Sequence, residues 1–344
     1  METKPMISLC MIVKNEETFL EKCLSSVKNF VEEIIIIDTG STDSTIDIAQ
    51  RFQAKIFHYK WDNHFANARN KGIAKATGEW ILWLDADEYL DIQDAEVYKE
   101  IIKNKDTNLL FLPITNLTGD RIDDPNHNAH IHYQPRLFRN HQGIKFINPI
   151  HESLDGEREN LTTDVLDLPI LHYGYINEVS IEKDKSTRNK RILKLEEKKE
   201  NHSPWVEYHL ASEYYRNKEY NQAFEYVNKS IFNFLLAGQK PPSILYKLKY
   251  DMFIQTNSMN QALPGIEKAL LLYPDYVDLH FYKGLFLFHQ SDYEAAKTCF
   301  EKCLELGESH PSYLILKGVG SFRATHYKKT CLEKLEASNK GEKK

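Results

Sequence analysis

Three carboxylates follow directly on an apolar run and give the sharpest chemical signal in the chain. Residues 80–84 (Trp-Ile-Leu-Trp-Leu) lead into Asp85, Asp87 and Glu88. If strand geometry persists past Leu84, side chains two positions apart point the same way. Carboxylates on one side repel each other unless a cation lies between them, and hard oxygen ligands favour Mg²⁺ or Mn²⁺. The segment therefore indicates a metal site. The structural alternative is that Asp85 or Asp87 caps a following helix.

A second acidic turn follows the Ile-rich run at residues 33–37. Asp38 can accept hydrogen bonds from a base or a ribose, and Gly40 lets the backbone turn tightly. The alternative is a plain strand-to-helix turn in which Ser41 or Asp43 caps the helix. We expect Asp43 to act only as a cap.

Arg69 is the basic residue of a third segment, Phe65-Ala66-Asn67-Ala68-Arg69-Asn70. A guanidinium near the start of a helix that leads to the acidic strand can pair with a diphosphate. The structural alternative is a surface ion pair.

Alternating elements must position these residues. Strands are predicted at 6–13, 33–37, 55–58, 80–84 and 109–114, and helices at 16–29, 44–52 and 67–76. This alternation predicts a mostly parallel, doubly wound sheet. Because ligands of such sheets bind beyond the carboxyl ends of the strands, the residues after Val13, Ile37 and Leu84 should line the site.

Residues 116–180 look less regular and are rich in Asp and His. We interpret this stretch as a variable loop that shapes a substrate pocket, with a solvated loop as the alternative.

Helical repeats dominate the sequence from Pro204 onward. Tyr250, Gly284 and Gly318 are spaced by 34 residues, and a 34-residue helix-turn-helix period is typical of tetratricopeptide (TPR) repeats. Residues 312–335 are interpreted as a degraded fourth repeat or a capping element. The predicted organisation is therefore an α/β domain over residues 1–178, a helical linker over 179–203 and an all-α repeat domain over 204–344.

Composition excludes several classes of protein. The 344 residues carry a formal charge of −6, too acidic for a chain that binds nucleic acid over its whole surface. The longest aliphatic run is far shorter than the ~20 residues of a membrane helix, so we expect no membrane span. The five cysteines are odd in number and form no CxxC motif, which favours a reducing, cytoplasmic location.

Taken together, three elements resemble the family 2 glycosyltransferases of GT-A fold. The elements are the opening strand 7–16, the turn 38–43, and the helix around 68–70 followed by the acidic strand end 84–88. The resemblance covers about residues 5–175. The attached repeats match a bacterial subgroup that joins the same two parts and includes the peptide S-glycosyltransferases of glycocin bacteriocins.

The resemblance implies a role for each matching position. The nucleotide sugar would be bound by the two strand ends, the Arg69 helix and the acidic segment: Val13, Lys14, Asn15, Glu17, Asp38, Thr39, Arg69, Asp85 and Ala86. The family often carries a second acid after the first, whereas this chain has Thr39 there. A divalent cation, Mg²⁺ or Mn²⁺, would be held by Asp87, Asp85 and His172.

The base is the least determined part of the predicted site. The family inverts the anomeric carbon in one displacement, so the acceptor needs a base on the face opposite the leaving group. Glu152 is the candidate and Asp124 the reserve. The alternative for Glu152 is an ion pair with Arg136 or Arg139.

The predicted function is an inverting, metal-dependent transfer of a hexose from a nucleotide sugar, most simply UDP-linked, to a peptide or protein. The repeats would hold that acceptor or form a homodimer. Two alternatives remain: transfer onto a saccharide of the cell surface or spore, and a non-catalytic TPR adaptor with a vestigial nucleotide-sugar domain.

Overall fold

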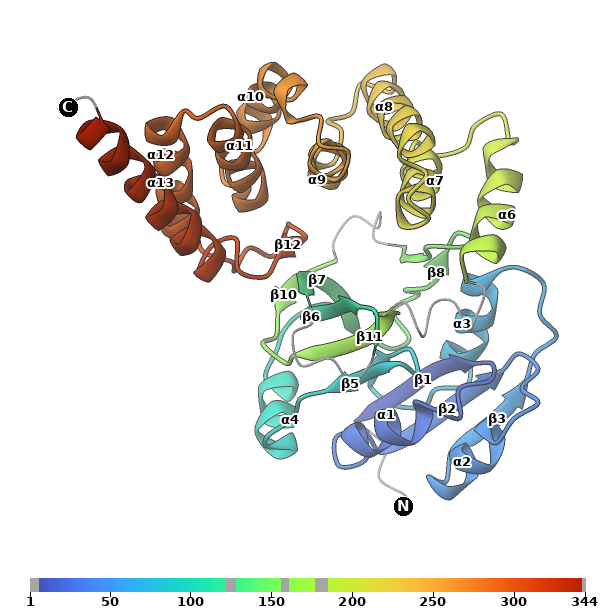
Figure 1. Ribbon diagram of the computed structural model, residues 1–344. Coiled ribbons are helices and arrows are strands. Elements are labelled where there is room, and N and C mark those ends of the chain that lie inside the picture. Colours follow the sequence, from blue (N-terminus) through green and yellow to red (C-terminus); the bar gives the residue numbers. More distant parts are fainter. Residues whose placement is uncertain (1–5, 122–127, 156–160, 177–184, 342–344) are drawn as a thin grey trace. The chain divides into compact units, whose positions relative to one another are not determined.

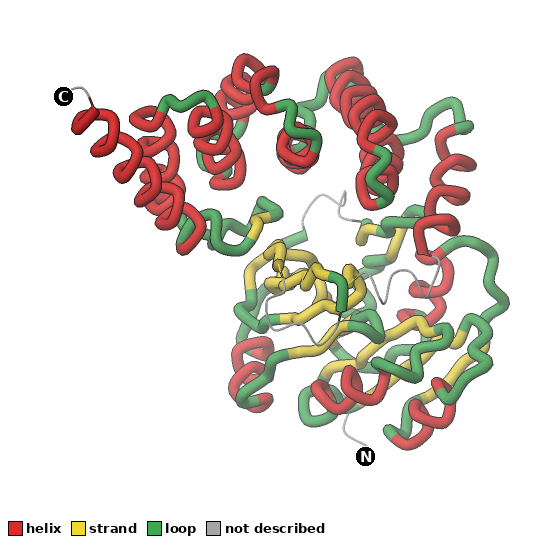
Figure 2. Tube along the Cα trace, viewed as in Figure 1, coloured by secondary structure: helices red, strands yellow, loops and turns green. Residues whose placement is uncertain are grey.

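The computed structural model describes residues 6–121, 128–155, 161–176 and 185–341. Contacts within the chain divide it into two compact units, Met1–Lys185 and Ser186–Lys344. The predicted boundaries of a separate linker at 179–203 stay a prediction. Figures 1 and 2 show the first unit as a sheet with helices and the second as helices.

Four parallel strands form the first half of the sheet, in the order β3-β2-β1-β4. Their bounds are β1 Ile7–Val13, β2 Glu33–Asp38, β3 Lys55–His58 and β4 Trp80–Trp83. The connecting helices are α1 Leu20–Val27, α2 Thr45–Arg51 and α3 Phe65–Ile73. The predicted fold class of this half is confirmed.

Helices cover both faces of these strands, and β1 is therefore buried on both sides. Its residues Leu9 and Met11 pack with α1 and α2 in one cluster, and Cys10 packs with α3 in another. The near-continuous apolar runs of β1 and β2 are what a parallel strand covered on both faces requires.

The second half of the sheet is mixed and continues β4-β7-β6-β11-β5, with β10 beside β6. The bounds are β5 Glu88–Leu90, β6 Leu109–Gly119, β7 Asn128–Arg139, β10 Thr163–Val165 and β11 Ile170–Ile176. Helix α4 spans Ala95–Lys103, and a small hairpin is made of β8 Phe146–Ile147 and β9 Ser153–Leu154.

The interpretation of residues 116–180 as a loop is wrong where β7 and β11 run. Strand β7 pairs with both β4 and β6, and β11 pairs with β6 and β5. The apolar alternation that marks a strand is broken there because the inner positions carry polar side chains such as His132 and His172, which belong to the candidate site described below.

The carboxyl ends of β1, β2 and β4 lie at one edge of the sheet. Val13 is in register with Asp38, and Cys10 with Trp83. This confirms the prediction that the segments following these strands share one edge.

The helical unit consists of hairpins followed by one long helix (Figure 1). The helices are α6 Lys185–Glu197, α7 Trp205–Arg216, α8 Tyr220–Leu236, α9 Ser243–Gln255, η1 Met259–Gln261, α10 Leu263–Leu272, α11 Val277–His289, α12 Tyr293–Leu306 and α13 Phe322–Gly341. The unit also contains the short strand β12, Ile315–Leu316.

Of the three residues spaced by 34 positions, two lie in helices. Tyr250 lies in α9 and Gly284 in α11, where both face the core. Gly318 lies outside any helix, at a φ of 98°, so the period does not continue as a helical pair there. Among the described helices, none is long and apolar enough to cross a membrane.

Candidate functional site

Asp38 closes the loop that follows β2. Its side chain is buried and accepts hydrogen bonds from the backbone N–H groups of Ser41 (2.9 Å) and Gly40 (3.3 Å), while His58 Nδ1 lies 3.1 Å from Oδ2. Burial alone would raise the pKa of Asp38, but these hydrogen bonds outweigh it and lower the pKa. An ionised acceptor therefore lies at the carboxyl edge of the sheet.

The segment after β1 braces the same loop. Asn15, at a φ of 54°, accepts from the backbone N–H of Thr42 (2.8 Å), and Glu17 accepts from the backbone N–H of Ser44 (3.0 Å). Two of the side chains predicted to flank the nucleotide thus hold the Gly40–Ser44 turn in place, and Lys14 between the strand and Asn15 is exposed.

Backbone contacts join the two loops at their start. The carbonyl of the buried Val13 accepts from both the N–H (3.0 Å) and the hydroxyl (3.1 Å) of Thr39. Asp43, one residue before the N-cap Ser44, accepts from the N–H of Thr45 in the first turn of α2 and from the N–H of Glu17, so it bonds the start of the helix and also ties the two loops. The expectation that Asp43 acts only as a cap was too narrow.

The acidic segment is a turn between two strands. Strand β4 ends at Trp83 and β5 begins at Glu88, so the premise that Asp85 and Asp87 continue a strand is wrong. The buried Glu88 closes the turn: its Oε2 accepts from the N–H of Asp85 (2.9 Å), and its own N–H donates to the carbonyl of Asp85 (3.1 Å). Ala86 is buried inside this turn.

Arg69 joins two acids that are far apart in the chain. Its Nη2 donates to Asp85 Oδ1 at 2.7 Å and its Nε to Glu152 Oε1 at 2.5 Å, with the Arg69 side chain only 7% exposed. Although burial opposes ionisation of Asp85, Arg69 and Arg136 outweigh it and lower the pKa of this carboxyl. The predicted ion-pair partner of Glu152, Arg136 or Arg139, is therefore replaced by Arg69.

Helix α3 and the β8–β9 hairpin create this bridge. His64 caps α3 by accepting from the N–H of Asn67. One helical turn later the Asn70 amide makes two hydrogen bonds with the Phe146 backbone, to its carbonyl (2.9 Å) and from its N–H (2.8 Å). The hairpin that carries Glu152 is thereby fastened to the helix that carries Arg69.

A second arginine, Arg136, also contacts Trp83 and supports the turn. The Arg136 guanidinium lies 3.7 Å from the Trp83 ring centre and the Arg69 guanidinium 4.5 Å, so the indole contacts both. Arg136 Nη2 pairs with Glu88 Oε1 at 2.5 Å, and both side chains are buried. Sequence reasoning missed the roles of Glu88 and Arg136; the buried pairing of a charge in β7 with the acidic segment has no local signal.

Asp87 meets His172 across the sheet. The distance from Asp87 Oδ1 to His172 Nε2 is 3.4 Å, and the N–H of Tyr173 donates to the Asp87 carbonyl at 3.1 Å. Burial would lower the pKa of His172, but its contact with Asp87 outweighs burial and raises it. Gly174 has no side chain at this point: a Cβ would lie 2.5 Å from His172 Nε2 and 2.6 Å from Asp87 Oδ2.

These residues test the predicted metal site. In the part of the chain that the structure describes, no group of three or more His, Cys, Asp and Glu is arranged to hold a metal ion. Two of the three predicted ligands, Asp87 and His172, lie 3.4 Å apart beside Gly174, where any side chain would collide with both, and the third, Asp85, pairs with Arg69. The carboxylate and imidazole donors fit a divalent cation that takes its other ligands from phosphate oxygens and water.

The reserve base, Asp124, lies outside the described residues. The chemistry that the described residues support is recognition of a polar ligand by Asp38 and the Asp85 turn, beside one fixed guanidinium. Glu152 stands on the other side of that guanidinium.

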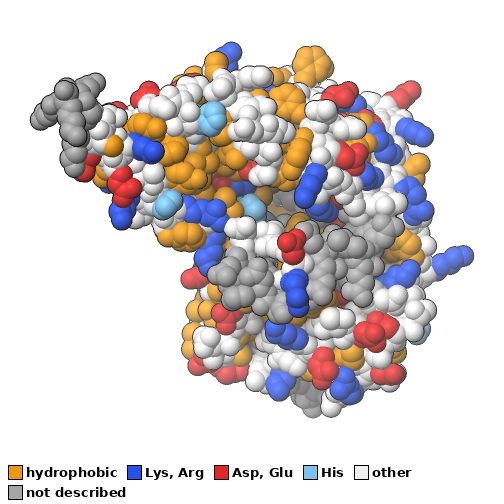
Figure 3. Space-filling view, in the orientation of Figure 1, with side chains coloured by type: hydrophobic (Ala, Val, Ile, Leu, Met, Phe, Trp, Pro, Cys, Tyr) orange, Lys and Arg blue, Asp and Glu red, His pale blue; other side chains and the backbone are white. Residues whose placement is uncertain are grey.

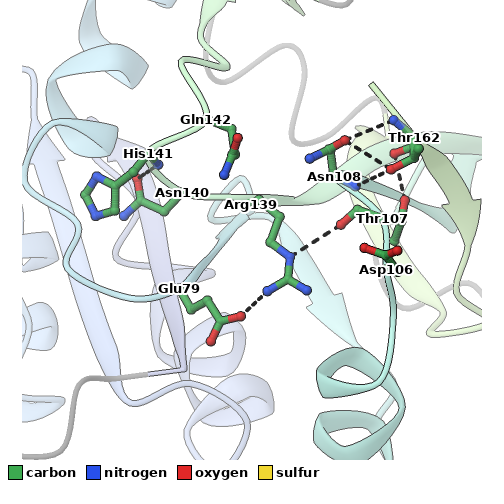
Figure 4. A pocket seen from close by; sticks show the side chains of 9 residues that line it. All are labelled: Glu79, Asp106, Thr107, Asn108, Arg139, Asn140, His141, Gln142 and Thr162. Carbon is green, nitrogen blue, oxygen red and sulfur yellow. Dashed lines mark hydrogen bonds and ion pairs between the residues drawn. The ribbon is translucent and has the colours of Figure 1, made fainter. Parts of the chain in front are cut away.

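A polar depression at the opposite edge of the sheet is a different feature (Figure 4). Its Arg139 is in register with Trp80, at the amino end of β4. Arg139 pairs with Glu79 and donates to the Thr107 carbonyl (3.4 Å), and Asn108 and Thr162 bond to each other. Because these polar groups pair and hydrogen-bond with one another, we interpret their role as structural: they hold the ends of the strands together.

Comparison with known proteins places these residues in a family. Residues 8–153 match the model of glycosyl transferase family 2, and residues 277–310 match a tetratricopeptide repeat model. The chain is 27% identical over 288 residues to the SPbeta prophage-derived glycosyltransferase SunS of Bacillus subtilis, which covers 82% of this chain and 67% of the relative.

A TPR repeat-containing protein of Synechococcus elongatus is 36% identical over 187 residues, 49% of this chain and 42% of that protein. The chain thus spans between 42% and 67% of the length of these two relatives. Among solved structures, S. aureus TarS in complex with UDP-GlcNAc matches with a TM-score of 0.41 and 16% identity, over 83% of this chain and 92% of that one.

The matched residues include Asp38, Arg69, the Asp85–Glu88 turn and Glu152, all of which lie between residues 8 and 153. Residues 8–153 of this chain therefore form a glycosyl transferase family 2 domain, followed by a C-terminal helical region that contains a tetratricopeptide repeat.

Proposed function

We propose that this chain transfers a hexose, with inversion, from a nucleotide sugar to a peptide or protein. The observation that carries the proposal is the Arg69 bridge, in which one buried guanidinium holds both Asp85 and Glu152. Two carboxylates that are 16 and 83 residues away from Arg69 in the chain meet at the carboxyl edge of a family 2 domain.

The donor is assigned to the edge formed by the loops after β1, β2 and β4. Asp38 is ionised and fixed by backbone N–H groups, which suits hydrogen bonds from the N–H groups of a base. The turn at Asp85 lies at the end of a neighbouring parallel strand and suits the ribose hydroxyls. A uracil base is the donor that we test first.

Asp87 and His172 would hold Mg²⁺ or Mn²⁺ against the donor phosphates. When bound, such a cation neutralises negative charge that develops on the departing diphosphate. In this arrangement the donor phosphates lie near the charge of Arg69. The Arg69 guanidinium is buried, and a charge in such a dry site acts more strongly than in water.

Inversion requires one displacement at the anomeric carbon. The bond from the acceptor oxygen or sulfur to carbon forms while the bond from carbon to the phosphate oxygen breaks. The acceptor proton goes to Glu152, and the electron pair of the broken bond stays on the diphosphate. If the acceptor is a cysteine, its thiol pKa of ~8.5 reduces the demand on the base.

The helical unit is assigned to the acceptor. Residues 277–310 match a TPR model, and helical repeats commonly bind peptides. Apolar side chains lie exposed over this unit (Figure 3), among them Trp205, Phe232, Leu235, Leu236, Leu271 and Phe322. The alternative use of the repeats, a homodimer, is separated by measuring the mass of the full chain in solution.

All five cysteines are free and buried, which supports our proposal of a reducing, cytoplasmic location.

A donor screen tests the function. The full chain is incubated with UDP, GDP and TDP sugars, with Mn²⁺ or with chelator, and hydrolysis and transfer to candidate peptides are read by mass spectrometry. We expect hydrolysis of one class of donor, dependent on metal. Absence of UDP binding by titration calorimetry, both with and without Mn²⁺, would overturn the proposal and favour the adaptor.

A further inference from the structure

A row of hydrogen-bonded polar side chains crosses the second half of the sheet and ends at Asp87. His132 comes from β7, Asn116 from β6 and His172 from β11, so three neighbouring strands each contribute one member. Asn116 is in register with His172 across the parallel pair, and His172 with Glu88 across the antiparallel pair. The row therefore connects the interior of the sheet with the acidic turn.

The hydrogen bonds of the row fix the position of each proton. Asn116 Nδ2 lies 2.9 Å from His132 Nδ1, and an amide nitrogen only donates, so His132 Nδ1 must accept. Asn116 Oδ1 lies 2.7 Å from His172 Nδ1, and a carbonyl oxygen only accepts, so His172 Nδ1 must carry a hydrogen. The other ring nitrogen, His172 Nε2, is then the one that faces Asp87 at 3.4 Å.

The buried surroundings of these side chains favour a single pattern of donors and acceptors. Asn116 is 6% exposed, and its amide is used at both ends. Burial, with Arg136 and His172 nearby, lowers the pKa of His132 to about 3, so the ring stays neutral over the ordinary pH range and one of its nitrogens remains free to accept. A buried amide without partners is unfavourable, so rotation of Asn116 away from either histidine is disfavoured.

We propose that Asn116 is the positioning residue of His172, and that its amide oxygen holds Nδ1–H so that Nε2 is presented to a divalent cation beside Asp87. The inference rests on the proposed function in one respect: it takes His172 as a ligand of that cation. Histidine ligands are commonly oriented through the other ring nitrogen in this way. Gly174 lies directly against this pair, since a Cβ at that position would be only 2.5 Å from His172 Nε2 and 2.6 Å from Asp87 Oδ2.

The tautomer of His172 is measured directly by NMR. The full chain is labelled with ¹⁵N in its histidine rings, and long-range ¹H–¹⁵N correlations are recorded without metal at an alkaline pH, where the ring is neutral. The signals of His172 among the 14 histidines are identified by their loss in His172→Gln. We expect a protonated Nδ1 and a bare Nε2. A protonated Nε2 in the wild-type protein overturns the inference, whether or not any variant folds.

Variants of Asn116 then test its role. Asn116→Leu keeps the approximate volume but removes the acceptor, so we expect mixed tautomers and Mn²⁺ affinity lower by about 10- to 100-fold, measured by electron paramagnetic resonance of free Mn²⁺. Asn116→Asp keeps an oxygen facing Nδ1 and should retain the wild-type tautomer. Thr118→Ala, which removes another side-chain hydrogen bond of β6 (Thr118 to the Asn128 carbonyl, 3.1 Å), is the matched control.

These measurements separate the inference from the proposed function. An Asn116→Leu protein with the wild-type tautomer and Mn²⁺ affinity refutes the positioning role, even if the enzyme transfers sugar. A wild-type protein with the expected tautomer but without Mn²⁺ binding in the presence of UDP refutes the metal part of the function. In that case Asn116 still orients the His172 ring, but this orientation does not serve to bind a cation.

Discussion

Glu152 shares its carboxylate with Arg69, and this pairing makes its role testable at the level of one atom. In Glu152→Gln the shape is kept and the proton-accepting charge is lost. Because general bases contribute about 10²–10⁴-fold, we expect transfer to fall by at least about 100-fold while the dissociation constant of the donor changes little. Single-turnover transfer rates and calorimetric donor binding measure the two effects. Equal losses in both would mean that Glu152 serves only to hold Arg69.

Asp87 carries the metal prediction. We expect Asp87→Ala to lose metal-dependent turnover, because several kcal/mol of charge stabilisation, about 100-fold or more in rate, depends on the cation. The melting temperature should stay close to that of the wild type. Asp164→Ala, which removes an exposed carboxylate paired with Lys105, is the control and should keep its activity. Full activity of Asp87→Ala, with an unchanged response to Mn²⁺, would refute the metal assignment.

At the scale of elements, β11 must approach the β4–β5 turn closely, and Gly174 permits this. Gly174→Ala would place a methyl group 2.5 Å from His172 Nε2. We expect a loss of stability of about 1–3 kcal/mol and a loss of Mn²⁺ affinity of about tenfold or more. Gly72→Ala in α3, whose added methyl would meet no atom nearer than 3.4 Å, is the matched control. Unfolding curves and Mn²⁺ titrations measure both changes, and unaltered Mn²⁺ affinity in Gly174→Ala would show that the close approach at Gly174 is not part of the metal site.

Glu33 connects β1, β2 and β3 at the other edge of the sheet. Its contacts predict that the stability of the fold decreases at acid pH. Burial would raise the pKa of Glu33, but hydrogen bonds from Lys55, Ser8 and Thr77 outweigh it and hold the pKa at about 2, against an ordinary 4.5. A lowered pKa stabilises the fold above pH 4.5, and this contribution disappears as the pH falls toward 2.

We therefore expect Glu33→Gln to be less stable than the wild type by roughly 2 kcal/mol at pH 7. The difference should shrink between pH 4.5 and pH 2. Urea unfolding at several pH values measures this, and a difference that is constant with pH would show that the charge of Glu33 is not the cause.

Most of the elements that sequence reasoning found are those with apolar residues at their buried positions. Strands β1, β2 and β4 and helices α1 and α2 lie near their predicted positions because most of their buried positions are apolar, and the partly exposed β3 and the Arg69-bearing α3 lie between them. Strands β7 and β11 were missed because His132 and His172 occupy inward positions where a strand pattern needs apolar residues. Gly318 preserved a 34-residue spacing without preserving the helix, since spacing alone carries no information on packing.

The same limit applies to the site. The positions of Asp38, Asp85 and Asp87 after strands, at the edge where ligands bind, were predictable, whereas Arg69 was expected at the start of a helix and lies in the middle of α3. Asn116 and Arg136 were not predictable, because they act through partners on neighbouring strands, and pairing across a mixed sheet is not visible in one sequence. The pairing of Glu152 with Arg69 rather than Arg136 depends on the β8–β9 hairpin for the same reason.

On the scale of the whole molecule, each unit has apolar cores of its own. The described core clusters of the first unit contain no residue of the helical unit, and the reverse also holds. This favours independent folding of residues 1–185, and it allows the use of the helical unit to be tested by removing it.

We expect the fragment 1–185 to hydrolyse the donor at a rate near that of the full chain but to lose transfer to a peptide. Donor hydrolysis serves as the internal control for folding, and mass spectrometry follows both reactions. A fragment that modifies the peptide as well as the full chain does would remove the acceptor from the helical unit. It would favour a small saccharide acceptor or a homodimer as the use of the repeats.

The bridge through Arg69 also has an evolutionary consequence. One side chain satisfies two acids on separate segments, so a neutral substitution at either acid leaves a desolvated charge behind on its partner. Substitutions at these three positions should therefore show strong epistasis: a substitution at one position is tolerated only after a substitution at another. Descendants of this domain that change sugar or acceptor would be expected to do so through the outer loops, with the triplet inherited as a block.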